Sequence, residues 1–234
     1  MSQNTRPLAI FGVAAALCYA LLWFAWGLHW SWLDSVDSLA LDPLHRYGLK
    51  HPAWVRFWDK FCGVFGPSSF RLAGAVVIVV AIFRRNLRVV LFILTTIGFS
   101  GVLTQIAKNL SDRPRPDSAL VFAPSTAFPS GHAVEVTAAV LALLTVSTGV
   151  FGRRARLVTV TIGAFLIVAI GVGRVVLNVH HPSDVLAGWA LGYLWFLLWL
   201  FVIRPLPLAA PAIPEEPVSA EEAGRTPEVP DTER

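Results

Sequence analysis

Charge is scarce in this chain, and so is cysteine. Only 15% of its 234 residues are charged, 55% are hydrophobic, and the mean hydropathy is +0.62. A soluble domain of this length does not need so little charge, and several apolar runs approach the ~20 residues that cross a bilayer. The runs are continuously apolar, which disfavours an alternating β-barrel. Two cysteines, Cys18 and Cys62, make a disulfide framework improbable.

The apolar runs predict an all-α membrane protein with six transmembrane helices. The first run is too long for a secretory signal and no small-residue cleavage site follows it, so we interpret it as a retained span. The expected spans are about 8–29, 69–84, 87–107, 130–150, 157–177 and 183–203.

Arginines set the expected topology. Three lie within 84–88 and three within 153–156, in two short connections that an even number of spans separates. The positive-inside tendency places both connections, and therefore both termini, in the cytoplasm. This predicts a multi-pass plasma-membrane protein whose connections 30–68, 108–129 and 178–182 face the exterior.

The first external connection contains aromatic residues at helical spacing. Trp54, Phe57, Trp58 and Phe61 recur at i, i+3, i+4 and i+7, a pattern typical of a helix in the membrane interface. An ordinary aromatic belt around the span ends is an equal alternative.

The chain divides into three expected regions. N-terminal spans and the interfacial segment occupy 1–94, and a catalytic core follows at 95–204. The tail, 205–234, holds seven acidic residues and two arginines and is rich in proline and alanine, so we expect it to be disordered in the cytoplasm. The remaining chain then carries about +9, which indicates topology or an anionic ligand rather than nucleic acid.

Ionisable residues gather in three places on the expected outer side. The first is the stretch from Lys108 to Arg115-Pro116, after the third span. A lysine offers a compact cation, and an arginine offers a planar fork that binds two phosphate oxygens. A basic interfacial loop is the alternative for this stretch alone.

The second place is Pro129-Ser130-Gly131-His132, at the start of the fourth span. A helix start presents free N–H groups to an anion. Ser130 is expected to cap the helix and donate its hydroxyl, and Gly131 to allow close approach of a ligand. His132 can deliver a proton to a departing oxygen. An N-cap with an incidental histidine is the alternative.

The third place joins the fifth and sixth spans. Arg174 lies about one turn inside an apolar run and should have an anionic partner, permanent or bound. Pro182 suits the first turn of the next helix, so Asp184 is expected to hydrogen-bond the imidazole of His180. A histidine–aspartate pair at a helix cap is the alternative, and His181 is expected to be a bystander.

Glu135 lies one turn after His132. It could keep His132 protonated, pair with Lys108 or Arg174, or be satisfied by neighbouring helices.

Together these three places resemble the motifs of the type-2 phosphatidic acid phosphatase superfamily, which includes bacterial lipid phosphatases and undecaprenyl-diphosphate phosphatases. The family's patterns K-x6-RP, PSGH and SR-x5-H-x3-D are met at matching spacing over about 95–203, except that Gly173 replaces the serine of the third. That replacement would remove a hydroxyl contact to the phosphate. The resemblance implies the helical core that the family shares with vanadium haloperoxidases, which are soluble.

The resemblance also implies a mechanism. His180 would attack phosphorus and form a phosphohistidine, Asp184 would orient it, and His132 would protonate the leaving oxygen.

No cofactor or metal is implied. The expected partners are the membrane and a lipid phosphate or diphosphate, with no nucleic acid. Phosphate transfer to another acceptor, or a non-catalytic transporter or scaffold, are the alternatives. The residues expected to bind phosphate oxygens are Lys108, Arg115, Ser130, Gly131 and Arg174.

Overall fold

Every regular element in the described part of the chain is helical, which confirms the predicted fold class. The computed structural model describes residues 6–206 and 208. The predicted disordered tail lies outside these residues except for 205, 206 and 208. The helices are α1 Arg6–Gly27, α2 Ser31–Lys50, α3 Pro52–Val64, α4 Pro67–Phe83, α5 Leu87–Ile93, α6 Ser100–Ser111, α7 Gly131–Val146, α8 Arg153–Val176 and α9 Pro182–Ile203, with a π-helical turn at Leu94–Gly98 between α5 and α6.

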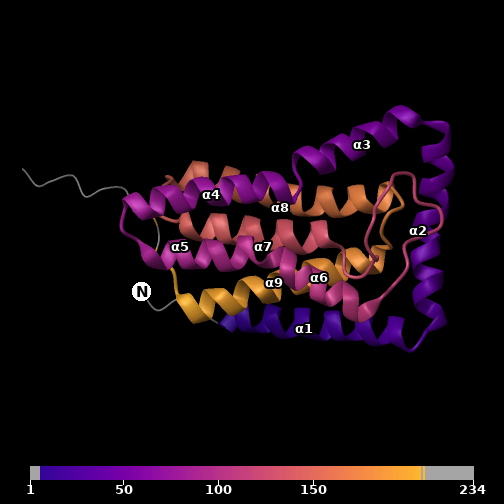
Figure 1. The fold of residues 1–234 in the computed structure, drawn as a ribbon, viewed down its shortest axis with the longest axis horizontal. Coiled ribbons are helices and arrows are strands. Elements are labelled where there is room, and N and C mark those ends of the chain that lie inside the picture. Colours follow the sequence, from indigo (N-terminus) through magenta and orange to yellow (C-terminus); the bar gives the residue numbers. More distant parts are fainter. Residues whose placement is uncertain (1–5, 207, 209–234) are drawn as a thin grey trace, which may run out of the picture.

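Five of the six predicted spans correspond to apolar helical elements long enough to cross a membrane. They are α1, the pair α3–α4, the run from α5 to α6, α8 and α9. The remaining expected span, 130–150, corresponds to α7. This helix has 16 residues and ends at Val146, so the expected span was too long. Most residues of α7 are buried, because the other helices surround it (Figure 1). An all-round apolar sequence suits such a central helix.

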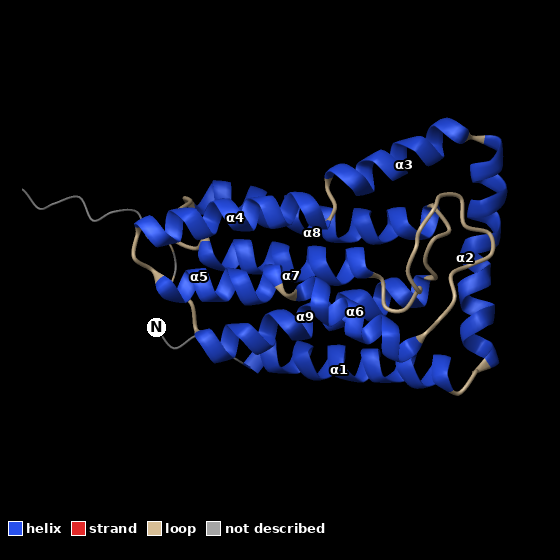
Figure 2. Ribbon diagram, in the orientation of Figure 1, coloured by secondary structure: helices blue, strands red, loops and turns tan. Residues whose placement is uncertain are grey.

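One long helix was missed by the sequence analysis. The first external connection begins with α2, which lies across one end of the bundle, while α3 continues towards α4 (Figures 1 and 2). The aromatic segment 52–61 is helical as expected, and its place in the membrane interface stays a prediction. α2 was missed because its mixed polar and apolar residues include an internal proline, Pro43.

The two ends of the bundle carry different connections. The α6–α7 and α8–α9 connections lie at the end that α2 covers, whereas the arginine-rich α4–α5 and α7–α8 connections lie at the other end (Figure 1). The beginning of α1 and the end of α9 also lie at that other end. This agrees with an even number of crossings between the arginine clusters, and the assignment of that end to the cytoplasm stays a prediction.

Two glycines of α9 allow it to touch α7. A Cβ on Gly192 would lie 2.5 Å from the carbonyl oxygen of Val134, and one on Gly188 would lie 2.8 Å from that of Ser130. Small residues let helix backbones approach closely in membranes. The contact fixes the start of α7 against the start of α9, and both starts carry predicted site residues.

Replacing Gly192 by alanine should therefore destabilise the bundle. The new methyl group meets backbone that cannot move away cheaply, and such overpacking costs about 1–3 kcal/mol. We expect a lower midpoint of thermal unfolding in detergent. Gly27→Ala is the matched control, since nothing lies within 4 Å of a Cβ there. Equal midpoints for the two variants would contradict the close contact.

Candidate active site

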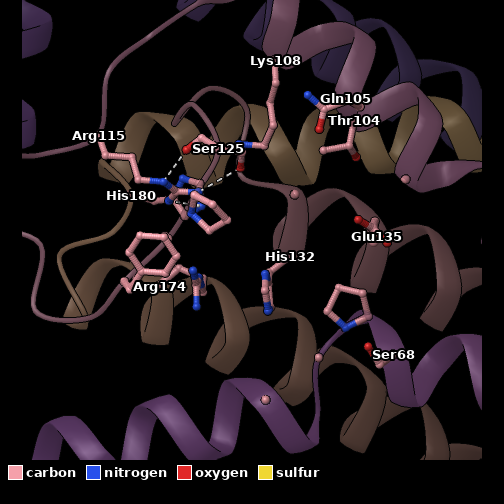
Figure 3. A pocket seen from close by; sticks show the side chains of 18 of the residues that line it. Ser68, Thr104, Gln105, Lys108, Arg115, Ser125, His132, Glu135, Arg174 and His180 are labelled. Atoms are coloured by element: carbon pink, nitrogen blue, oxygen red, sulfur yellow. Dashed lines mark hydrogen bonds between the residues drawn. The ribbon is translucent and has the colours of Figure 1, made fainter.

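A cavity of about 650 Å³ is lined in part by residues of the α6–α7 and α8–α9 connections, and Figure 3 shows its side chains. Its remaining walls come from α3, α4, α6, α7 and the end of α8. Two of the eight predicted site residues, Ser130 and Asp184, do not line it and lie behind its wall. The six that line it are Lys108, Arg115, Gly131, His132, Arg174 and His180.

Arg115 reaches from the α6–α7 connection to the α8–α9 connection. Its Nε donates to the carbonyl of Ser125 at 2.5 Å, and its Nη2 donates to the hydroxyl of that residue at 3.2 Å. Its Nη1 donates to the carbonyl of Val179 and lies 3.1 Å from Nε2 of His180. Burial, together with the charge of Arg174, lowers the pKa of Arg115 to about 10, so it remains a cation at neutral pH. Arg115 therefore holds a positive charge beside the imidazole.

Lys108 lies in the last turn of α6 and is almost completely buried. Its ammonium donates to the carbonyl of Thr126 and lies 3.5 Å from that of Ala127. Backbone carbonyls of the α6–α7 connection thus orient the ammonium without neutralising it. Its charge stays available to an anion in the cavity.

Arg174 lies in the last turn of α8, and only 8% of it is exposed. Within residues 6–206 and 208, no carboxylate lies within ion-pair distance of its guanidinium, and its Nε has no hydrogen-bond partner. The anionic partner expected for Arg174 is therefore not a side chain of the described chain. An anion bound in the cavity would supply it.

His180 lies in the connection between α8 and α9 with 1% of its surface exposed. Arginine is always a donor, so the contact from Arg115 requires an unprotonated Nε2 and places the imidazole proton on Nδ1. Burial lowers the pKa of His180 to about 3; Asp184 opposes this shift, and the charges of Arg174 and Arg115 add to it. The imidazole is thus neutral at physiological pH, as a nitrogen nucleophile must be.

His180 and Asp184 face each other as expected, but their separation exceeds that of an ordinary hydrogen bond. Nδ1 of His180 lies 3.6 Å from Oδ2 of Asp184 and has no hydrogen-bond partner. The physical reason is competition, because Oδ2 accepts from the backbone N–H of His181 at 2.8 Å and contacts its Nδ1 at 3.0 Å. His181 is therefore not the expected bystander, since it caps α9 and holds the carboxylate.

The other oxygen of Asp184 belongs to a buried ion network that the sequence analysis missed. Nη1 of Arg113 donates to Oδ1 of Asp184 at 2.7 Å, and its Nη2 donates to Asp37 of α2 at 2.8 Å. Asp37 also accepts from the backbone N–H of Ser183 at 3.0 Å and from its hydroxyl at 2.6 Å. The side chains of Arg113 and Asp37 are each only 2% exposed. The network joins α2, the α6–α7 connection and the start of α9.

Removing Asp37 should loosen this support. Asp37→Ala leaves Arg113 with one carboxylate where two were present, and breaking a buried ion pair costs about 3–5 kcal/mol. We expect a large fall in thermal stability in detergent. Asp34→Ala is the matched control, because Asp34 is exposed on the same helix. A stability of Asp37→Ala equal to that of the control would show that the network carries no free energy.

The start of α7 differs from expectation at Ser130. Its side chain is fully buried, makes no capping bond to the helix, and has no hydrogen-bond partner for Oγ. The residue is held through its backbone, since its N–H donates to the carbonyl of Asp184 at 2.9 Å. Gly131 and His132 line the cavity as expected, and His132 lies in its middle (Figure 3).

Glu135 pairs with a residue outside the three motifs. Its Oε2 accepts a hydrogen bond from Nη2 of Arg71 on α4, and this is its ion pair in the described chain. Neither Lys108 nor Arg174 is its partner. One signal in the sequence pointed to Arg71, since an arginine near the start of an apolar run is costly unless it is paired.

The glycine that replaces the motif serine has a packing reason. A Cβ on Gly173 would lie 2.6 Å from Sγ of Cys62 and 2.8 Å from Cε3 of Trp58. Position 173 thus faces α3 closely, and Gly173 does not line the cavity. The glycine allows α3 to pack onto α8 beside Arg174.

The low pKa of His180 predicts a pH dependence of stability. The unfolded chain protonates this histidine near pH 6.5, whereas the folded protein does not until about pH 3. Between these values the unfolded state binds the extra proton, so stability falls as pH falls. From pH 7 to pH 5 the wild type should lose about 2 kcal/mol more than His180→Gln, measured by denaturant unfolding in detergent. Parallel pH profiles would argue against a buried neutral imidazole.

Comparison with known proteins identifies the family of the chain. The family model described as the PAP2 superfamily matches residues 89–206. Phosphatidylglycerophosphatase B of Bacillus subtilis is 35% identical over 137 residues, covering 57% of this chain and 68% of that protein. A lipid A 1-phosphatase of Rhizobium etli is 35% identical over 125 residues, covering 48% of this chain and 49% of its own length.

A solved structure shows the same fold. The crystal structure of a transmembrane PAP2-type phosphatidylglycerolphosphate phosphatase from Bacillus subtilis superposes with a TM-score of 0.72 and 23% identity, over 82% of this chain and 96% of that one. The family model and the named relatives together identify a helical membrane phosphatase. Since the family model covers half of the chain, the protein belongs to the PAP2 superfamily.

Proposed function

We propose that this protein removes a phosphate group from a membrane lipid through a covalent phosphohistidine on His180. One observation carries the proposal: Nε2 of His180 lies 3.1 Å from Arg115 at a cavity that Lys108 and Arg174 also line. Three cations around one neutral imidazole suit a phosphate group that is attacked by nitrogen.

The reaction proceeds in two displacements. When phosphate enters, the N–H of Arg115 that faces His180 donates its hydrogen bond to a phosphate oxygen instead. The lone pair on Nε2 of His180 is then free. That lone pair forms the N–P bond while the bond from phosphorus to the leaving oxygen breaks. His132, protonated once the phosphate dianion lies beside it, gives that oxygen a proton. Water then attacks the phosphohistidine, gives a proton back to His132 and releases inorganic phosphate, which restores His180.

Electrostatic stabilisation is the main contribution of the protein. Lys108, Arg115 and Arg174 surround the three non-bridging oxygens, whose charge grows or spreads in the transition state. The N–H groups at the start of α7, beside Gly131, add their dipoles. Asp184 assists from behind, because its charge 3.6 Å from Nδ1 favours the tautomer with a free Nε2.

The proposed substrates are phosphorylated lipids presented at the outer face of the membrane. The names of the relatives favour phosphatidylglycerol phosphate or a lipid A 1-phosphate, and polyprenyl diphosphates and phosphatidate are further candidates. Outer-face placement rests on the arginine-rich connections at the opposite end of the bundle.

His180→Ala should abolish turnover. Removing a nucleophile costs several orders of magnitude in kcat, measured as phosphate release from this lipid panel in detergent. His51→Ala, an exposed histidine at the start of α3, is the control and should retain the wild-type rate. Repeating the assay with an acceptor lipid separates hydrolysis from phosphate transfer. Unchanged release by His180→Ala would contradict the proposal.

A further inference from the structure

A second polar cluster lies on the far side of His132 from His180. In Figure 3, Glu135 and Ser68 are separated from His180 and Arg174 by His132, and Gln105 lies above them. Arg71 lines the same part of the cavity. None of these residues belongs to the three motifs, and the two displacements described above use none of them.

The centre of this cluster is the ion pair between Arg71 of α4 and Glu135 of α7. The Arg71 side chain is 48% exposed and that of Glu135 is 12% exposed, so the pair is reached from the cavity. One guanidinium nitrogen is committed to Oε2 of Glu135. Other N–H groups of Arg71, and Oε1 of Glu135, remain available to a ligand.

Two glycines leave room around the pair. A Cβ on Gly101 of α6 would lie 3.0 Å from Nη2 of Arg71 and 3.8 Å from both carboxylate oxygens of Glu135. A Cβ on Gly131 would lie 3.8 Å from Oε1 of Glu135. Larger side chains at these positions would occupy the space in front of the pair.

The direction of the reaction places the leaving group there. Phosphoryl transfer keeps the attacking and leaving atoms roughly in line. With His180 attacking from one side and His132 protonating the leaving oxygen, the rest of the leaving alcohol extends beyond His132. Glu135 is one helical turn further along α7, so that alcohol meets the ion pair.

The pair of Arg71 and Glu135 carries no net charge, and this sets which ligand it prefers. It offers donors and an acceptor together, which suits a hydroxyl group next to the leaving oxygen, whereas the carboxylate repels a phosphate joined directly to that oxygen, as in a diphosphate. We propose that Arg71 and Glu135 form a leaving-group subsite that binds a free hydroxyl of the leaving alcohol, so that the enzyme prefers lipids whose phosphate is carried by a polyol over those whose phosphate is carried directly by diacylglycerol. This rests on the proposed function of His180 and His132.

The test compares two phosphomonoester lipids in the same detergent. The alcohol that leaves phosphatidylglycerol phosphate is phosphatidylglycerol, whose head-group glycerol carries a free hydroxyl beside the leaving oxygen. The diacylglycerol that leaves phosphatidate carries no such hydroxyl. We expect the ratio of their kcat/KM values to fall about tenfold in Arg71→Gln and in Glu135→Gln, as for one lost hydrogen bond to a charged group. Gly101→Val should lower the same ratio by filling the space without changing charge.

The ratio separates recognition from structural damage. A variant that only disturbs α7 and His132 lowers both rates equally, and an unchanged ratio would overturn the subsite. Arg154→Gln, an exposed arginine at the opposite end of α8, is the matched control and should keep the wild-type ratio. A different result would assign the subsite to a second phosphate and overturn the proposed hydroxyl recognition. In that result, Arg71→Gln selectively loses activity towards a polyprenyl diphosphate, and Glu135→Gln gains activity towards it.

A binding measurement keeps the inference independent of turnover. In His180→Ala protein, glycerol 1-phosphate should bind about tenfold more tightly than propyl phosphate by titration calorimetry, and adding Arg71→Gln should remove that difference. Absence of phosphate release by the wild type would refute the proposed function alone. Equal affinities for the two phosphates would refute the subsite alone.

Discussion

The active end of this protein depends on one buried cation, Arg113. Its guanidinium lies 5.0 Å from the ring of Trp26 and donates to two carboxylates that come from helices far apart in the sequence. Charges so deeply buried are tolerated only when they are paired and hydrogen-bonded. Asp37 therefore holds α2 across the end of the bundle, and Asp184 holds the first turn of α9. Because α9 also contacts the start of α7, the positions of His180 and His132 follow from the same network.

The candidate active-site cavity has the opposite electrostatic character. Lys108, Arg115 and Arg174 are held by backbone carbonyls or by packing rather than by acidic side chains. A carboxylate in ion contact with each cation would compete with a phosphate, whereas a carbonyl dipole orients a cation and leaves its charge. The acidic groups that stabilise this end of the bundle, Asp37 and Asp184, lie behind the cavity wall. Support and reaction are thus separated in space.

The sequence predicted the helical class, the five longer spans and six residues that line the cavity, because hydropathy runs and short motif spacings are local properties. It failed where a result depends on a partner distant in the sequence. The Arg113–Asp37 and Arg71–Glu135 pairs join residues 76 and 64 positions apart. It also wrongly assigned a helix-capping role to the hydroxyl of Ser130, since spacing fixes the place of a residue on a helix and not the direction of its side chain. The length of α7 was overestimated for a related reason, because hydropathy alone does not tell at which residue an apolar helix ends.

The position of Glu135 explains why the motifs alone define a reaction and not a substrate. In the proposed reaction, the motif residues that line the cavity act on the phosphate side or, in the case of His132, at the bond that breaks. The groups beyond that bond come from α4, the middle of α6 and the second turn of α7, which lie outside the motifs. A chain can therefore keep the phosphate chemistry while residues such as Arg71 and Gly101 vary. A transition-state contact raises specificity only where two substrates differ. The candidate lipids share the phosphate group and differ in the leaving alcohol, so the proposed reaction places discrimination between them on the leaving-group side.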